Sequence, residues 1–132
     1  MINREQWRED LRKRLEPEQQ ARPGGGSHWI SVGEGWKELI CNLVDRLDAL
    51  GLPYNVLQVK EKFGTLRFYA HCEQESQEFD RMVSRAERIS RKICEDCGRK
   101  GMLRGDSWIR TLCVDCDRKF KDLRSGGKRL AQ

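Results

Sequence analysis

Four cysteines in the last third of the chain have the type and spacing of metal ligands. They form two Cys-x-x-Cys pairs with fifteen residues between them: Cys94 with Cys97, and Cys113 with Cys116. This spacing is typical of one tetrahedral zinc ion held by four thiolates. Four thiolates fill the coordination sphere and leave no position for a reactive water molecule. The sequence therefore predicts one structural Zn²⁺ that stabilises a fold and does not catalyse a reaction.

Two other chemistries use cysteines in such numbers. A disulfide framework is typical of small secreted domains, but the first residues contain no apolar segment of a signal peptide. An iron–sulfur centre also takes four cysteines.

No apolar run approaches the roughly 20 residues that cross a bilayer. We therefore expect a soluble, cytoplasmic protein in a reducing compartment. Among the three chemistries, we favour zinc bound by the cysteines.

Charge is distributed unevenly along the 132 residues. Residues 1–80 carry 11 lysines and arginines against 14 acidic residues, and residues 81–132 carry 15 against 7. The segment that contains the two Cys-x-x-Cys pairs is thus strongly basic, and it stays basic after four thiolates and Zn²⁺ add a charge of −2. A basic surface of this kind favours an acidic partner, either a nucleic acid or an anionic face of a protein.

The elements that must position the cysteines follow from hydrophobic periodicity. Apolar residues at three- and four-residue steps predict three helices, at residues 4–15, 36–50 and 76–93. We expect Asn3 to cap the first helix and Gly51 to end the second. Between the second and third helices, residues 55–60 and 66–70 are rich in β-branched and aromatic side chains, which predicts a β-hairpin packed on the second helix.

The segment that holds the cysteines has the pattern of a zinc finger. Cys94 and Cys97 precede Gly98 in a knuckle, residues 102–104 and 108–112 predict a second hairpin, and the second cysteine pair would open a helix that ends near Leu123. This arrangement is similar to a treble clef, and a zinc ribbon is the competing layout.

The predicted fold class is α+β. Its segments are an N-terminal helix and flexible loop (1–28), a helix, hairpin and helix core (29–93), the finger (94–124) and a disordered basic tail (125–132).

Four basic residues on the third predicted helix fall on one side of it. Arg81, Arg85, Arg88 and Lys92 recur at three- and four-residue steps, which places them in one stripe at about 100° per residue. We call them the basic ridge. The ridge could bind phosphates or an acidic protein, or it could be the solvated side of an amphipathic helix. Two arginines of the predicted finger could extend the same surface: Arg104 and Arg110.

Aromatic residues offer a second candidate surface. Phe63 follows Lys60 and Lys62 and precedes Gly64 at the predicted hairpin turn. Its ring could anchor a partner, with the two lysines as flanking charges. The alternative, which we favour, is that its ring folds back onto the core. Tyr69 and Trp108 could stack on nucleic-acid bases, but we expect each to pack under the hairpin or the finger.

No set of residues suggests catalysis. His28 and His71 are the only histidines, and no glycine-rich phosphate loop is present. Cys72 follows His71 directly, so in a strand the two side chains would point to opposite faces and would not form a catalytic pair. Cys41 lies off the apolar stripe of its helix and is best explained as a small buried residue. We expect a protein that is not an enzyme and has no small-molecule substrate.

Three further blocks accompany the cysteines: Gly35-Trp36, the Lys-Glu-Lys-Phe-Gly-Thr-Leu-Arg-Phe-Tyr sequence of residues 60–69, and Trp-Ile-Arg-Thr-Leu-Cys at residues 108–113. Together with the first cysteine pair they resemble a family of small, mostly uncharacterised proteins found in bacteriophages, prophages and bacteria. The resemblance covers residues 29–116. It implies a phage or mobile-element origin and a shared fold, and it brings no activity with it.

Two classes of function fit these features. The first is a zinc-stabilised interaction protein that binds a bacterial protein or nucleoprotein complex, such as an anti-defence or host-takeover factor acting in the host cytoplasm. The second is a nucleic-acid-binding protein whose basic half contacts phosphates with little sequence specificity. We favour the first, because no predicted helix has the form of a base-reading helix.

Overall fold

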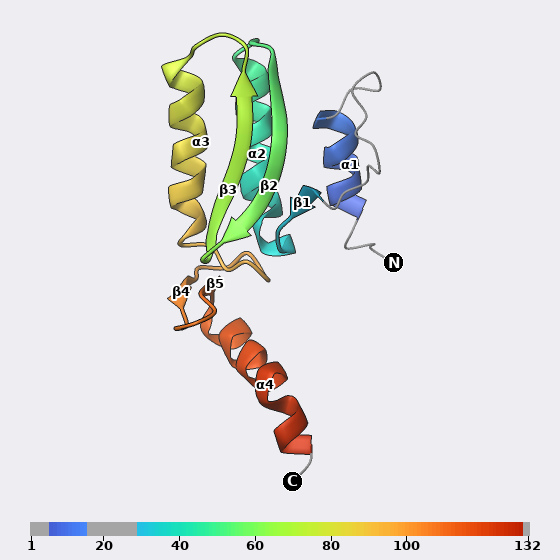
Figure 1. Cartoon of the computed structure of the whole chain (residues 1–132), viewed down its shortest axis with the longest axis vertical. Helices are drawn as coiled ribbons and strands as arrows, with labels where there is room; N and C mark the ends of the chain where they lie inside the picture. The colour runs from blue at the N-terminus through green and yellow to red at the C-terminus, as the bar shows by residue number, and fades with distance from the viewer. Residues whose placement is uncertain (1–5, 16–28, 131–132) are drawn as a thin grey trace.

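Helices cover one face of a small three-stranded sheet, and a finger with its own helix extends from one end of this core (Figure 1). This computed structural model describes residues 6–15 and 29–130, with side chains to residue 124. The predicted α+β class is confirmed. The elements in chain order are α1 (Gln6–Leu15), β1 (Ile30–Ser31), a 3₁₀ turn (Glu34–Trp36), α2 (Lys37–Ala49), β2 (Tyr54–Lys62), β3 (Thr65–Cys72), α3 (Gln77–Ser90), β4 (Met102–Arg104), β5 (Arg110–Leu112) and α4 (Val114–Leu130).

The central helix α2 forms where the apolar periodicity predicts it. Its apolar stripe is buried against the sheet, and Gly51 ends it with the positive φ of 72° that glycine adopts without strain. In Figure 1 the helix lies behind β2 and β3. The buried residues of this stripe and of the turn before it are Trp36, Ile40, Leu43, Val44 and Leu47.

Helix α1 joins the same core through a narrow apolar stripe. Trp7 and Leu11 are buried, as their spacing predicts, and the guanidinium of Arg14 donates to the carboxylates of Asp45 and Asp48 on α2 at 2.7 Å each. The predicted Asn3 cap and the predicted flexible loop lie outside the described residues.

The predicted hairpin is confirmed, and the structure adds a short third strand. The strands β2 and β3 pair antiparallel through a two-residue loop, Phe63-Gly64, and the two residues of β1 pair parallel with β2. Two-residue loops favour positive φ at both positions, and both residues have it here, 54° and 77°. The sequence did not predict β1, because a strand of two residues is too short to show a periodic pattern.

Helix α3 protects the outer edge of the sheet. Ser76 caps it, with its hydroxyl accepting from the N–H of Phe79. Two of its side chains accept hydrogen bonds from the exposed edge of β3: Glu87 from the N–H of Phe68 at 3.0 Å and Ser90 from the N–H of Leu66 at 2.9 Å. These bonds occupy donors that another chain could otherwise pair with.

Replacing the buried Ser90 with alanine should test this edge contact. The change leaves the N–H of Leu66 without its partner, and an unsatisfied buried donor costs about 1–3 kcal/mol. We expect the free energy of unfolding in urea to fall by that amount and the Leu66 amide to lose hydrogen-exchange protection. Ser84→Ala on the exposed side of the same helix is the matched control, and an equal loss in both variants would contradict the edge contact.

The finger contains the predicted second hairpin and a longer helix than predicted. The pairing of β4 with β5 matches the prediction, and α4 begins directly after Cys113. The helix backbone continues to Leu130 and so includes residues 125–130, where we expected a disordered tail. The apolar pattern ends at Leu123, and two glycines follow, so the sequence carries no signal for this extension. No helix in the described parts of the chain is long and apolar enough to cross a membrane.

Candidate metal centre and its surroundings

The two predicted cysteine pairs converge on one point. The Sγ atoms of all four cysteines lie within 4.8 Å of one another, and those of Cys97 and Cys113 are 3.6 Å apart. A tetrahedral ion with metal–sulfur bonds of about 2.3 Å would separate its sulfur ligands by about 3.8 Å. The four side chains are free thiols without disulfide bonds. The cluster can hold a metal ion, and its all-sulfur donor set is consistent with zinc.

Local backbone geometry explains how each pair is presented. In the first pair the N–H of Gly98 donates to the carbonyl of Cys94 at 3.0 Å, and Gly98 has a φ of 83° that closes the knuckle. In the second pair Cys116 lies in the first turn of α4 and its N–H donates to the Sγ of Cys113 at 3.3 Å. This hydrogen bond lowers the pKa of the Cys113 thiol to about 7 and so favours the thiolate that a metal requires.

A ligand pair on a helix start distinguishes the observed finger from a zinc ribbon. The first pair belongs to a knuckle, a two-stranded hairpin follows, and the second pair is placed by α4. This is the order of elements of the predicted treble-clef-like finger. The positive dipole end of the helix lies at this ligand pair, where the N–H of Cys116 bonds to the Sγ of Cys113.

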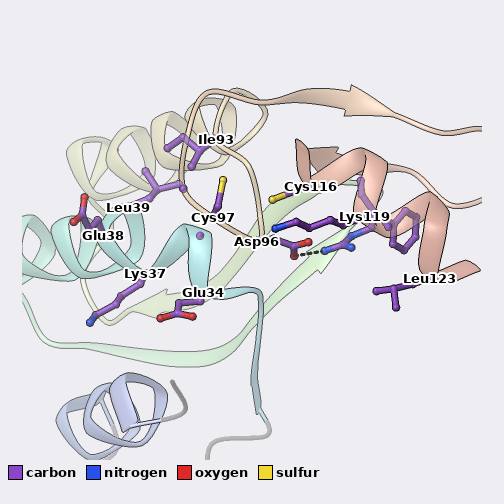
Figure 2. Close-up of a pocket in the computed structure, with 14 residues that line it drawn as sticks. Glu34, Lys37, Glu38, Leu39, Ile93, Asp96, Cys97, Cys116, Lys119 and Leu123 are labelled. Carbon is purple, nitrogen blue, oxygen red and sulfur yellow. Dashed lines mark hydrogen bonds and ion pairs between the residues drawn. The ribbon is translucent and has the colours of Figure 1, made fainter. Parts of the chain in front are cut away.

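One side of the cluster opens into a hollow between α2, the knuckle and α4. The hollow has a volume of about 750 Å³. Cys97 and Cys116 lie together at its wall, with Leu39 and Ile93 to one side and Leu123 to the other (Figure 2). Cys94 is fully buried, whereas Cys97 is exposed. A chelator would therefore reach the cluster from the side of Cys97.

The finger is joined to the core by hydrogen bonds and close approaches that the cysteine pattern does not reveal. The N–H of Gly35 donates to the carbonyl of Glu95 at 2.8 Å, and the indole N–H of Trp36 donates to the carbonyl of Ile93 at 2.9 Å. A Cβ on Gly35 would overlap the carbonyl oxygen of Cys94, and one on Gly33 would overlap that of Glu95. The sequence Gly33-Glu34-Gly35, uninformative by itself, thus allows the core to approach the metal knuckle.

The hairpin turn makes a second junction with the finger. The hydroxyl of Thr111 donates to the carbonyl of Gly64 at 2.6 Å, and the space where Gly64 would carry a Cβ is occupied by Leu103 and Arg110. Glu95 accepts from the N–H of Thr111 at 2.7 Å. Burial raises the pKa of Glu95 to about 7, against the opposing effects of this hydrogen bond and of Arg110. The finger is therefore attached to the core at two points. Glu95, which follows Cys94 in the chain, contacts Gly35 at the first point and Thr111 at the second.

The basic ridge is exposed along its whole length. Arg81, Arg85 and Arg88 project from α3, and Lys92 follows in the turn after it. None of the four forms an ion pair with another residue of the described chain. Three of these side chains are thus arginines without a counter-ion on a rigid helix.

The two arginines of the finger have a different environment. Arg110 is partly buried, donates to Asp96 at 2.7 Å and lies 3.6 Å from Glu95. Arg104 donates to the carbonyl of Leu112 at 2.9 Å and pairs with Asp117 at 3.8 Å. These contacts hold the finger together, so its arginines are not a free extension of the ridge.

Three aromatic residues that we expected to be buried are exposed. Phe63 is 64% exposed, Trp108 is 54% exposed and Tyr69 is 41% exposed. For Phe63 the reason is the turn, because its positive φ directs the side chain outward while Gly64 makes the contact with the finger. Tyr69 lies on the face of the sheet opposite α2, which none of the described helices covers (Figure 1). Trp108 contacts Phe120 of α4 edge to face at 5.3 Å but keeps half its surface in solvent.

The remaining candidates stay apart from the metal centre. Cys41 and Cys72 are half-buried, and burial raises the pKa of the Cys41 thiol. His71 is exposed, and it pairs across the sheet with Asn55, one position away from the pairing of Cys72 with Tyr54. His28 lies outside the described residues. No protein family, curated protein or solved structure was found to match the chain.

Proposed function

We propose that the cysteine cluster binds one structural Zn²⁺ and that this ion fixes the finger on the core. The support is the donor set and its compactness. An iron–sulfur cluster would place several ions and sulfides among the four Sγ atoms, which would have to lie farther apart than the 4.8 Å observed. Four thiolates complete the tetrahedron, so the zinc supplies folding free energy and a rigid junction.

We further propose that the protein is a non-catalytic interaction module that binds an acidic segment of a partner protein. The observation that carries this proposal is a groove of about 680 Å³ between α2 and α3. Its floor is apolar, and its rim carries three arginines against two glutamates. The floor includes Leu39, Leu43, Met82, Ala86, Ile89 and Ile93, and the rim includes Arg46, Arg81, Arg85, Glu38 and Glu78.

The chemistry of the groove defines the partner. An amphipathic segment would place apolar side chains on the floor, where Ile89 is 37% exposed, and carboxylates against the unpaired arginines. Desolvated arginines with bidentate geometry are strong anchors for carboxylates. The sequence resemblance described above would make this partner a bacterial protein or nucleoprotein complex and the chain a phage or mobile-element product.

Charge reversal in the ridge should test this function. The double variant Arg85→Glu, Arg88→Glu reverses two exposed charges without touching a packed residue, so fold and zinc content should persist while binding is lost. The immobilised protein would be exposed to bacterial lysate, and co-purifying proteins and absorbance at 260 nm would both be measured. The matched control is Lys13→Glu, Lys37→Glu, which makes the same charge change on α1 and α2.

Two results would refute the proposal. If the ridge variant captures the same partners as the wild type, then the ridge is only a solvated helix surface. If the control loses binding equally, then net charge and not the groove determines association.

A further inference from the structure

Among the described elements, no helix packs on one face of the three-stranded sheet, and the cations on this face pair with no described carboxylate. In antiparallel pairs, residues directly opposite each other point to the same face. The pairs Gln58 with Tyr69 and Lys60 with Arg67 therefore share a face, and α2 lies against the opposite one (Figure 1). We call the surface formed by Gln58, Lys60, Lys62, Arg67 and Tyr69, together with the turn residue Phe63, the open sheet face.

The charge of this face has a single sign. Lys60, Lys62 and Arg67 form no ion pair with any residue in the described parts of the chain. The one carboxylate in β1, β2 and β3 belongs to Glu61, which alternates to the other face and accepts from the N–H of Gly64 at 2.7 Å. An anion on the open sheet face would therefore meet three cations and no acidic side chain of the three strands.

Two exposed rings stand at the two ends of this set of charges. The ammonium of Lys60 lies 5.7 Å from the centre of the Tyr69 ring, and that of Lys62 lies 5.8 Å from the centre of the Phe63 ring. Along the hairpin the order is Phe63, then the three cations, then Tyr69. Rings beside a group of cations suit single-stranded nucleic acids, since bases stack on the rings and phosphates bind the charges.

The backbone of Phe63 supports a binding role for this face. A φ of 54° is a region that side chains larger than asparagine rarely adopt, because the Cβ approaches the neighbouring carbonyl. The ring is 64% exposed, so burial in the core does not compensate this strain. Strained residues on a rigid frame are characteristic of binding sites.

We propose that the open sheet face binds single-stranded nucleic acid, with Tyr69 and Phe63 stacking on bases and Lys60, Lys62 and Arg67 contacting phosphates. This inference goes beyond the proposed function, because it uses neither the ridge nor the groove between α2 and α3. It also differs from phosphate binding by the basic zinc half, since its residues belong to the two strands of the core hairpin.

Binding would be measured by fluorescence anisotropy with the full chain and labelled oligonucleotides. The probes are single-stranded DNA and RNA of about 12 nucleotides, a length within the range that single-strand binding folds occupy, and a DNA duplex of the same sequence. At about 50 mM salt the protein should bind the single strands more tightly than the duplex, and the affinity should fall log-linearly with salt concentration. Failure to bind any single strand, or equal affinity for the duplex, would overturn the proposal.

Substitutions separate stacking from charge. Tyr69→Ala should weaken binding roughly 5- to 150-fold, the range for loss of one base–aromatic stack, whereas Tyr69→Phe keeps the ring and should bind like the wild type. Lys60→Gln and Arg67→Gln should each lower the slope of log affinity against log salt by about 0.7. Lys37→Gln on α2 makes the same charge change away from this face and should leave the slope unchanged.

The Phe63 turn offers a variant with opposite effects on stability and binding. Phe63→Asn gives the Asn-Gly sequence that two-residue hairpin loops prefer, so the thermal midpoint should rise or stay equal while oligonucleotide affinity falls. If Tyr69→Ala and Phe63→Asn both bind oligonucleotides with wild-type affinity, then the open sheet face is not the nucleic-acid site. If only Arg85→Glu, Arg88→Glu abolishes oligonucleotide binding, the ridge is the nucleic-acid site and this inference is wrong. If the same three cations bind an acidic peptide and no oligonucleotide, then the partner of this face is not a nucleic acid and the inference is wrong.

Discussion

Serine in place of Cys94 should release the metal and unfold the finger. Cys94 is fully buried, and its backbone carries contacts to both sides of the knuckle: its N–H donates to the carbonyl of Arg99 at 2.7 Å and its carbonyl accepts from Gly98. Structural zinc in small fingers binds with an apparent free energy of about 10–16 kcal/mol. This exceeds or equals the whole stability of a typical domain, about 5–15 kcal/mol. Loss of one ligand should therefore remove most of the zinc and the hydrogen-exchange protection of β4, β5 and the start of α4.

The chain supplies its own control for this experiment. Cys72 is half-buried in β3 and lies outside the cluster, so Cys72→Ser removes a thiol without removing a ligand. Zinc content by elemental analysis and the thermal midpoint should match the wild type closely in Cys72→Ser and fall sharply in Cys94→Ser. Equal zinc content in the two variants would contradict the assignment of the ligands.

Alanine in place of Gly35 should separate the finger from the core without removing a ligand. Its Cβ would overlap the backbone of Cys94 and Glu95, where no flexible side chain can move away. The N–H of Gly35 would lose its 2.8 Å hydrogen bond to Glu95 as the two segments part. Overpacking of this kind costs about 3 kcal/mol, at the upper end of the usual range. We expect a lower free energy of unfolding together with zinc that is still bound and more easily removed by a chelator.

Gly51→Ala is the matched control for that prediction. Gly51 has a positive φ of 72°, but no neighbouring atom lies within 4 Å of the position that a Cβ would take. Alanine there meets only backbone strain of about 1–2 kcal/mol. Zinc release by chelator should be unchanged in Gly51→Ala. If Gly35→Ala and Gly51→Ala behave alike in both stability and zinc release, then close approach at the knuckle is not what holds the finger.

Local signals in the sequence predicted the parts of the fold that depend on neighbouring residues. The spacing of the cysteines predicted the cluster, and apolar periodicity predicted α2 and α3 because each buries a regular stripe. The β-branched and aromatic residues on either side of the turn predicted the hairpin. The helix start at Cys113 followed from the polar and apolar pattern after it. In each case the residues that carry the signal are also the residues that make the contact.

The features that prediction missed depend on contacts between distant segments. The role of Gly33 and Gly35 is visible only when Cys94 and Glu95 lie against them, about 60 residues later in the sequence. Arg110 looked like a free surface charge because Asp96 and Glu95 are its partners only after the finger closes. Phe63 was expected in the core because aromatic residues usually are, whereas a positive φ in the two-residue loop turns it outward.

Metal analysis of the purified wild-type protein tests the central claim most directly. The protein would be prepared without added metal, its metals measured by mass spectrometry, and its thiols titrated before and after a chelator. We predict about one zinc per chain, with the reactivity of Cys41 and Cys72 unchanged by the chelator and the four clustered cysteines reactive only after it. A chain without zinc, or one in which all six thiols react at the same rate, would contradict this claim.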